Sequence, residues 1–340
     1  MKVAVVGVTG VVGETLLRVL DERRLEVDVL GAFASRDRSE PLRWRERDWP
    51  IFAATPEALA RGGYDVVFFA SSDDASAELA RHAVDAGAIV IDNSATFRLS
   101  DGVPLVVPEV NPEHVRAGDR IFPVANCSAI VLCVGIAPIA RSAGLRSVRV
   151  ATYQAVSGAG KAGLETLAEE ERAEFTLEQS GRESPFAAEI FRNVIPLVGS
   201  QFDERGDSGE EKKLAAETRK MLALPHLHVA ATTVRVPVRY AHSEAVFLET
   251  ERDTSVAELA SALEEASGVV FHRSGMVTPR DVEGQDLVHV ARLRAEGDSA
   301  RHFQLWVVGD QVRKGAATNA VQILELLIAR GHFAPPVVSA

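Results

Sequence analysis

The stretch KVAVVGVTGVVGETLLRVL, residues 2–20, decides the fold of this 340-residue chain. Its segment 2–7 is a mostly apolar run, which is typical of a buried parallel strand. Gly7, Gly10 and Gly13 follow, and an amphipathic helix should then continue to about Arg23. Such a glycine turn places backbone N–H groups and a helix N-terminus around a pyrophosphate. The order of strand, turn and helix therefore favours a dinucleotide site over a plain tight turn, although the spacing is G-x-x-G-x-x-G rather than G-x-G-x-x-G.

The following residues continue this alternation of strands and helices. Apolar runs at 27–35, 64–71 and 88–92 are predicted strands, and 74–85 is a predicted helix. Strands that alternate with helices indicate βαβ units, which build a doubly wound parallel sheet. We therefore expect an α/β fold whose N-terminal domain is of the Rossmann type.

The pattern changes from about Arg146 onward. The predicted strands now alternate polar and apolar residues, and they lie at 147–156, 228–240, 243–250, 287–296 and 302–310. Such alternation predicts an antiparallel or mixed sheet with one covered face, and the expected covering helices lie near 160–176, 208–223 and 254–266. We expect a second, α+β domain over residues 129–314. Residues 1–128 and about 315–340, with a last helix near 316–330, should form the dinucleotide-binding domain.

Composition narrows the class of protein. With 46% hydrophobic residues the chain can bury a large core, and its length favours two domains. The net charge of −11 gives no electrostatic footprint for nucleic acid or anionic membranes. Two cysteines cannot build a disulfide framework, so a reducing, cytoplasmic setting is expected. The N-terminus has no signal-peptide pattern, and the longest apolar run, 129–140, is too short to span a bilayer.

The end of the second predicted strand bears on the choice of cofactor. It reads ASRDRSE and carries Ser35, Arg36, Arg38 and Ser39. An acid at this position would accept from the ribose 2′-hydroxyl of NAD, whereas arginine accommodates the 2′-phosphate of NADP. The two guanidiniums and two hydroxyls favour NADP. The alternative is a solvated loop in which Asp37 pairs with the neighbouring arginines.

Both cysteines lie in the stretch FPVANCSAIVLCVG, residues 122–135. Cys127 should stand in the first turn of a helix that runs to about Ala143, where backbone amides and the helix dipole lower a thiol's pKa. The alternative is a small buried apolar residue, which is our interpretation of Cys133. Neither cysteine has a partner at metal-ligand spacing, so no metal site is expected.

Other polar residues could serve chemistry nearby. Arg235 could clamp a carboxylate, and His242, seven residues later at the start of a strand, could exchange a proton. Glu210 and Lys213 share one side of a predicted helix, and Gln154 ends a strand before a Gly/Ser turn. Taken alone, each could equally be an ordinary surface or loop residue.

Taken together, these segments resemble the aspartate-β-semialdehyde dehydrogenase family over essentially the whole chain. The stretches that carry the resemblance are VGVTGVVGETLLRVL, IDNSATFR, VPEVNPE, ANCSAI, ATYQAVSGAGKAG, PFAAEIFRNVIPLVGSQFDERGDSGEEKKLAAETRKML, TTVRVPVRYAHSEAVFLE and LWVVGDQVRKGAATNAVQILE. The combination of Asn-Cys-Ser, R-V-P-V…H-S-E and K-G-A-A-T-N-A in one order is specific.

The resemblance implies a role for each polar residue of the site. Cys127 would be the nucleophile, Gln154 would orient it, and His242 would be the general acid/base. Arg235 and Glu210 would hold the α-carboxylate and α-amino groups of the substrate.

The resemblance also implies phosphate and cofactor ligands. Arg98, Lys213 and Asn126 would form the site for inorganic phosphate, and Asn319 would lie near the nicotinamide. The expected cofactor-binding residues are Gly7, Thr9, Gly10, Val11, Val12, Gly13, Ser35, Arg36, Arg38, Ser39, Ser71, Ser157, Gly158 and Asn319.

The implied activity is the NADP-dependent reductive dephosphorylation of L-aspartyl-β-phosphate to L-aspartate-β-semialdehyde, through a cysteine thioester. It would serve biosynthesis of lysine (with diaminopimelate), threonine, methionine and isoleucine. The partners expected are a small-molecule substrate, inorganic phosphate and further copies of the chain, as a homodimer or homotetramer paired through the second domain.

The chain departs from the family pattern in three places. The Asn-Pro pair usual before Asn-Cys-Ser is missing, so we expect a turn into the helix that differs from the family's. One extra residue in ASRDRS leaves open whether Arg36 or Arg38 binds the 2′-phosphate, and Asp73 and Asp74 have no assigned role. The alternative is an N-acetyl-glutamyl-phosphate reductase, which shares the thioester chemistry. Its nucleophile typically stands in a Gly-Cys-Tyr setting that NCSAI does not fit.

Overall fold

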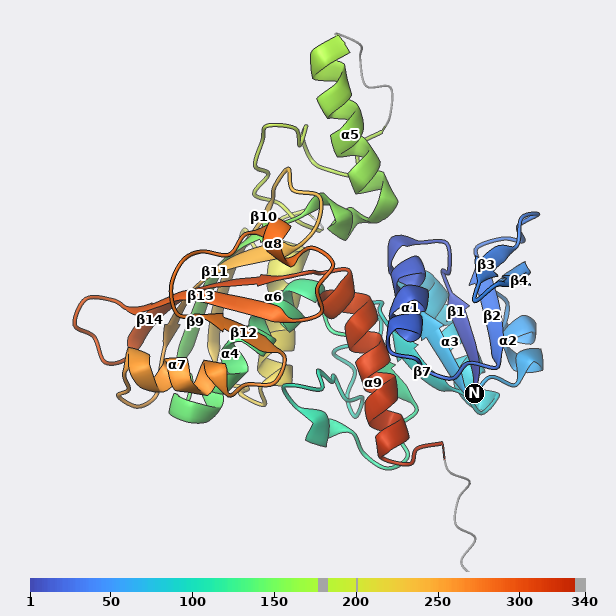
Figure 1. Ribbon diagram of the computed structural model, residues 1–340, viewed down its shortest axis with the longest axis horizontal. Helices are drawn as coiled ribbons and strands as arrows, with labels where there is room; N and C mark the ends of the chain where they lie inside the picture. Colours follow the sequence, from blue (N-terminus) through green and yellow to red (C-terminus); the bar gives the residue numbers. More distant parts are fainter. Residues whose placement is uncertain (177–182, 200, 334–340) are drawn as a thin grey trace, which may run out of the picture. The chain divides into compact units, whose positions relative to one another are not determined.

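A computed structural model describes residues 1–176, 183–199 and 201–333 (Figure 1). The chain divides into two compact units: Met1–Ala125 with the segment that begins at Ala316, and Asn126–Gly315. Residues 126–128 were predicted to lie in the first of these. They belong to the second because Asn126 and Cys127 bond to side chains within it, as described below.

The described residues of the first unit form a parallel six-stranded sheet in the order β5-β2-β1-β6-β7-β8. Its strands are β1 (Lys2–Val6), β2 (Val29–Ala34), β5 (Ile51–Ala53), β6 (Val66–Phe69), β7 (Ile89–Asp92) and β8 (Ile121–Pro123). From β1 the chain adds β2 and then β5 on one side of β1. It then returns to add β6, β7 and β8 on the other side of β1. The switch point between β1 and β6 is where an open α/β sheet of this kind binds its ligand. The Rossmann-type prediction is confirmed.

Four helices of the described first unit pack in pairs. They are α1 (Val11–Glu22), α2 (Pro56–Gly62), α3 (Asp73–Asp85) and α9 (Thr318–Ala329). Helix α1 contacts α9, and α2 contacts α3, while α3 and α9 both contact β7. The core between helices and sheet contains the fully buried rings of Phe33, Phe68 and Phe69.

The described residues of the second unit form a mixed six-stranded sheet in the order β10-β9-β11-β14-β13-β12. Its strands are β9 (Ser147–Gln154), β10 (His228–Arg235), β11 (His242–Glu249), β12 (Val269–His272), β13 (Val288–Ala295) and β14 (His302–Gly309). The four central strands, β9, β11, β14 and β13, pair antiparallel with one another. The edge strands pair parallel with their neighbours, β10 with β9 and β12 with β13. The predicted mixed sheet is confirmed.

One face of this sheet is covered by helices. Helix α4 (Cys127–Ala143) contacts β11, β13 and β14; α6 (Gly209–Met221) contacts β10; and α7 (Val256–Glu264) contacts β12 and β13. Strand β11 shows the resulting alternation, because His242, Glu244 and Val246 are buried under the helices whereas Phe247 is exposed. Helix α5 (Gly160–Thr176) extends away from the sheet in Figure 1.

Several short elements were not predicted from the sequence. Strands β3 (Leu42–Trp44) and β4 (Arg47–Trp49) form a hairpin whose turn residues, Arg45 and Glu46, both have positive φ. Such turns usually carry Gly, Asn or Asp, so this one has no recognisable sequence signal. The other unpredicted elements are β5, β8, β12, α2, η1 (Pro112–His114) and α8 (Pro279–Val282).

The last helix begins later than predicted. A π-helical turn, η3 (Arg313–Ala317), precedes α9. Within the ranges that the structure describes, no helix is both long enough and apolar enough to cross a membrane.

Candidate active site

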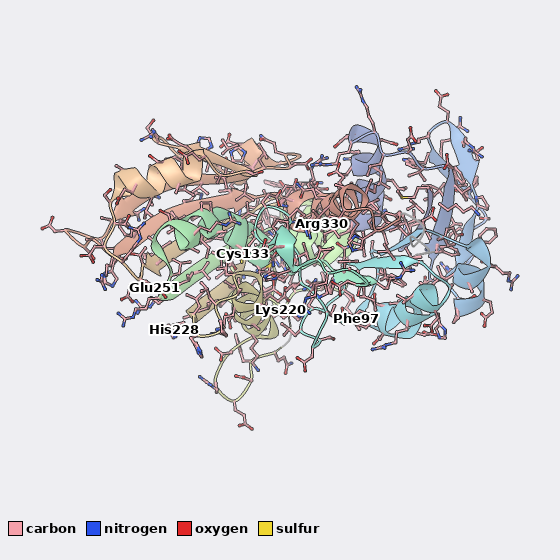
Figure 2. All side chains as sticks on the ribbon, turned by 90° about the horizontal axis from the view of Figure 1, so that it is seen from below. Phe97, Cys133, Lys220, His228, Glu251 and Arg330 are labelled. Atoms are coloured by element: carbon pink, nitrogen blue, oxygen red, sulfur yellow. The ribbon has the colours of Figure 1, made fainter. Side chains whose placement is uncertain are left out.

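The thiol of Cys127 lies at the first residue of α4. Asn126 is the N-cap of this helix, and its side-chain oxygen accepts the Ala129 N–H at 3.1 Å, which is a stabilising cap. Cys127 is partly exposed, whereas Cys133, labelled in Figure 2, is fully buried. Burial raises the pKa of the Cys133 thiol, so this residue remains a neutral packing residue, as predicted.

The backbone of Gly315 runs directly past Cys127. A Cβ atom at position 315 would lie 2.9 Å from the Cβ atom of Cys127, so a larger residue would displace the thiol. Gly315 lies in the K-G-A-A-T-N-A stretch that carries part of the family resemblance, but it was not predicted as a site residue. The available signal was a glycine just before the predicted last helix, because glycine allows a close approach of the backbone to a neighbouring group.

His242 is fully buried beside the thiol. Its Nε2 lies 3.6 Å from the Cys127 sulfur, and its Nδ1 accepts the Ala155 N–H at 3.1 Å. Because Nδ1 acts as an acceptor, the proton of the neutral ring lies on Nε2 and faces the sulfur. The pKa of His242 is well below its usual range because the ring is buried and because Arg235 is near, so the ring is neutral at physiological pH.

Arg235 forms the cationic part of the site. Its guanidinium donates to the Ala155 carbonyl at 2.6 Å and lies over the Phe186 ring. Burial lowers the pKa of Arg235, and the nearby Cys127 and Glu210 side chains act in the opposite direction. A Cβ atom at Gly158 would lie 2.8 Å from the Arg235 Nη1 and 3.5 Å from the His242 Nε2. A side chain at position 158 would therefore displace the Arg235 guanidinium, whereas it would only contact the His242 ring.

Glu210 connects two amide side chains of the site. Its Oε1 accepts from the Asn126 Nδ2 at 2.9 Å and from the Gln154 Nε2 at 3.3 Å. Gln154 donates to the Thr152 hydroxyl at 3.3 Å as well. The sequence-predicted residues of the thiol site thus lie within one unit and share a network, in which Gln154 reaches Cys127 through Glu210 and Asn126.

Gln311 holds the turn before His242 and was missed by sequence reasoning. Ala241 adopts a φ of 66°, and its N–H donates to the Gln311 side chain at 2.8 Å. The same side chain donates to the Ser157 hydroxyl, which in turn donates to the Arg239 carbonyl. Ser157 and Gly158, predicted cofactor residues, therefore lie in the turn η2 (Val156–Ala159) beside the catalytic groups. No local pattern around Gln311 could have shown this contact.

The glycine turn of the first unit has the geometry that a dinucleotide needs. Gly7 has a φ of 89°, and a Cβ atom there would lie 2.2 Å from the Ala70 carbonyl oxygen. A Cβ atom at Gly13 would lie 2.3 Å from the Gly7 carbonyl oxygen. Gly10 is the N-cap of α1 and gives that helix no side-chain cap, so its N-terminal amides are available to an anion.

Ser71 supplies a second observation at the same place. It follows β6 next to Ala70, and its hydroxyl is buried with no hydrogen-bond partner among the described residues. A buried hydroxyl of this kind normally has a partner, so a ligand group would satisfy it. The residues of this loop therefore fit a bound dinucleotide.

The loop after β2 exposes two guanidiniums. Asp37 accepts the Ala53 N–H at 2.7 Å and so ties the loop to the end of β5. Arg36 and Arg38 are exposed, and in the described ranges neither forms an ion pair. The alternative in which Asp37 neutralises its neighbours is therefore not what the structure contains, and both arginines are available to a 2′-phosphate.

Asp73, which had no assigned role, positions the loop that leads to Arg98. Its carboxylate accepts the Ala95 N–H at 2.8 Å, and its carbonyl accepts from the Thr96 hydroxyl at 2.9 Å. Arg98 is nearly buried and donates to the Asn93 carbonyl at 2.7 Å. Asp73 therefore has a structural role in the first unit.

The remaining predicted residues lie in different units. Lys213 is on α6, and the described residues form no hydrogen bond or ion pair with its side chain. Asn319 is fully buried in α9 and donates to the Val106 carbonyl at 3.2 Å, which ties α9 to its own unit. Among the residues that the structure describes, no group of His, Cys, Asp and Glu side chains could hold a metal ion.

Two family models match the chain. The one described as semialdehyde dehydrogenase, NAD binding domain, matches residues 2–118. The one described as semialdehyde dehydrogenase, dimerisation domain, matches residues 136–314. The first match covers the glycine turn, and the second covers the sheet that carries Gln154, Arg235 and His242.

Curated relatives and solved structures agree with this match. An aspartate-semialdehyde dehydrogenase of Aquifex aeolicus is 39% identical over 337 residues, which cover 97% of this chain and 98% of the relative. The crystal structure of aspartate semialdehyde dehydrogenase II from Vibrio cholerae has a TM-score of 0.91 at 38% identity, covering 96% of this chain and 98% of that one. The Candida albicans enzyme, solved with NADP, has a TM-score of 0.74 at 25% identity, covering 97% and 99%. These relatives do not favour an N-acetyl-glutamyl-phosphate reductase. The chain therefore belongs to the aspartate-semialdehyde dehydrogenase family.

Proposed function

We propose that this chain is an NADP-dependent aspartate-semialdehyde dehydrogenase. It converts L-aspartyl-β-phosphate to L-aspartate-β-semialdehyde and inorganic phosphate, in the biosynthesis of the aspartate family of amino acids in the cytoplasm. The observation that carries the proposal is the Cys127 thiol at the start of α4, 3.6 Å from the Nε2 of a buried His242. The relatives at about 40% identity supply the substrate class.

Cys127 provides covalent catalysis. Its sulfur attacks the acyl carbon of the aspartyl phosphate, the carbon–oxygen bond to phosphate breaks, and phosphate leaves with the bonding electrons. The resulting thioester keeps the acyl group activated. When bound, NADPH supplies the hydride that reduces this thioester. The carbon–sulfur bond then breaks, and Cys127 regains its thiolate as the aldehyde is released.

His242 stabilises negative charge in these steps. Its Nε2 proton faces the sulfur, where it can hydrogen-bond the thiolate and the oxyanion that forms on the adjacent carbon. The same proton is the one available for transfer if His242 acts as the general acid/base. To take up a second proton, the ring would have to give up the Ala155 N–H bond to its Nδ1.

The anionic substrate requires local cations, because the chain as a whole is negative. We propose that Arg235 holds the α-carboxylate and that Glu210 holds the α-amino group, with Gln154 orienting the acyl group. Arg235 is buried beside the thiol, where its charge is screened little by solvent. Arg98, Asn126 and Lys213 are the proposed ligands of inorganic phosphate.

The residues proposed to hold NADP are those expected from the sequence. They lie in the glycine turn, in the loop after β2 that carries Ser35, Arg36, Arg38 and Ser39 (the arginine loop), and at Ser71, Ser157, Gly158 and Asn319. The N-terminus of α1 would receive the pyrophosphate. The exposed guanidiniums of Arg36 and Arg38 would receive the 2′-phosphate.

We propose a homodimer that pairs through the face of the second sheet that α4, α6 and α7 leave uncovered. This face exposes Tyr153 and Phe247, and Tyr153 packs on Trp306 with ring centroids 5.5 Å apart. Exposed aromatic side chains on an uncovered sheet face are typical of an interface. The same sheet lies in the segment that matches the family's dimerisation domain, which favours a second copy of the chain as the partner.

The central activity test uses aspartate-β-semialdehyde, NADP and phosphate, with NADPH absorbance as the readout. The wild-type enzyme should form NADPH, and Cys127→Ala should lower kcat by roughly four orders of magnitude or more, because the nucleophile is lost. Cys133→Ala is the matched control and should retain turnover. Persistent activity in Cys127→Ala, or turnover of the N-acetyl-glutamate semialdehyde alone, would contradict the proposal.

The arginine loop is tested with Arg36→Ala and Arg38→Ala. Loss of a bond to the 2′-phosphate should raise the KM for NADP by about 10- to 100-fold and leave the KM for NAD nearly unchanged, since NAD lacks that group. Steady-state kinetics with both cofactors identifies which arginine is responsible. If neither variant changes the ratio of the two KM values, this loop does not read the 2′-phosphate.

The dimer face is tested with Phe247→Arg and sedimentation velocity. A guanidinium at the centre of an apolar interface should shift the protein to monomers at micromolar concentration. The control is Phe52→Arg, which changes an exposed phenylalanine of the first unit and should leave the dimer intact. A dimeric Phe247→Arg protein would place the interface elsewhere.

A further inference from the structure

Glu217 is a buried carboxylate of α6 that has no part in the mechanism above. It lies seven residues after Glu210, which is two helical turns later on the same side of the helix. Only 1% of its surface is exposed. Its Oε2 accepts the backbone N–H of Asn126 at 2.5 Å, and a bond from an N–H to a carboxylate is stronger than one between neutral groups.

Two carboxylates of one helix thus hold the residue before the nucleophile. Glu210 accepts a hydrogen bond from the side-chain amide of Asn126, and Glu217 accepts one from its backbone N–H. The other two polar groups of Asn126 are also engaged, because its Oδ1 accepts from Ala129 and its carbonyl accepts from Ile130. The first pair of bonds joins Asn126 to α6, and the second pair joins it to α4.

Helix α6 is itself fixed to the sheet. Ser208 and Glu211 form a capping box at its start, and the Glu211 Oε1 accepts the Thr233 N–H of β10 at 2.9 Å. Strand β10 ends at Arg235 and pairs in register with β9, which carries Gln154. A continuous set of bonds therefore leads from the sheet through α6 to the backbone N–H and the side chain of Asn126, the residue before Cys127.

We propose that Glu217 is a positioning residue, which fixes the backbone at Asn126 and thereby holds the Cys127 sulfur against His242. This inference rests on the proposed role of Cys127 as the nucleophile. A carboxylate suits the position, because negative charge at the N-terminal end of a helix is favoured and a buried N–H needs a strong acceptor. The sulfur lies 3.6 Å from Nε2, so a small shift of the first turn of α4 changes this contact directly.

Three substitutions of Glu217 separate the effect of its hydrogen bond to Asn126 from the effect of its side-chain volume. Glu217→Leu removes the acceptor, Glu217→Asp shortens it by one methylene, and Glu217→Gln retains an acceptor of the same length. Leu263→Ala is the control for stability alone, because it removes a fully buried side chain of α7 in the same unit and leaves the bonds of Asn126 to α6 in place.

The readouts are the rate at which iodoacetamide alkylates Cys127, followed by peptide mass spectrometry, together with kcat, KM and the thermal unfolding midpoint. Glu217→Leu and Glu217→Asp should lower both kcat and the alkylation rate by about 10- to 100-fold, with the KM for NADP within about twofold, because small displacements of a reacting group have effects of this size. Glu217→Gln should restore most of both rates. Leu263→Ala should lower the unfolding midpoint and leave the alkylation rate of the folded enzyme unchanged.

The proposal is overturned if Glu217→Leu or, should that variant not fold, Glu217→Asp alkylates and turns over at the wild-type rate. It is also overturned if Leu263→Ala reduces alkylation in the same proportion to its loss of stability, since Glu217 would then act on stability alone. Alkylation needs no substrate. Suppose that the enzyme fails to turn over aspartate-β-semialdehyde but the Glu217 variants show the expected alkylation rates. This result would count against the proposed function and not against the positioning role of Glu217.

Discussion

The structure depends on how one residue, Asn126, is held between two helices. Its backbone and side chain make four hydrogen bonds, two to carboxylates of α6 and two to the first turn of α4. Helix capping alone would start α4 at this point, but it would leave the first turn of α4 free to shift relative to α6. The bonds to α6 remove that freedom. The position of Cys127, and with it the distance from sulfur to imidazole, follows from the placement of its neighbour.

Electrostatics explains how a chain of net charge −11 can bind an anionic substrate. Arg235 is buried near the thiol, so its charge acts at short range in a medium of low polarity. His242 contributes a neutral N–H rather than a second positive charge, because its Nδ1 already accepts a backbone N–H. Such a group stabilises charge that develops during reaction without requiring an imidazolium in the interior.

The sequence was sufficient to predict those elements that depend on the chemistry of neighbouring residues and on the hydrophobic periodicity of a strand or helix. The glycine turn, the first strand and the helix starting after Asn126 depend on residues close together in the chain, and each was predicted within a few residues. The short strands β3 and β4 and the π-helical turn before α9 were missed, because they carry no periodic pattern. Among the site residues, Glu217 and Gln311 were missed for a different reason. Glu217 bonds to Asn126 across 91 positions, and Gln311 bonds to Ala241 across 70, so neither contact leaves a local signal.

The account rests on the formation of an acyl group on one sulfur at the start of α4. The most direct test is to mix the enzyme with aspartate-β-semialdehyde and NADP in the absence of phosphate, quench with acid, and map the adduct by mass spectrometry. Hydride transfer should then stop at the thioester. The account predicts one aspartyl group per chain on the peptide that contains Cys127, labile to hydroxylamine and formed together with one NADPH. A burst of NADPH with Cys127 unmodified, or an adduct on any other residue, would contradict it.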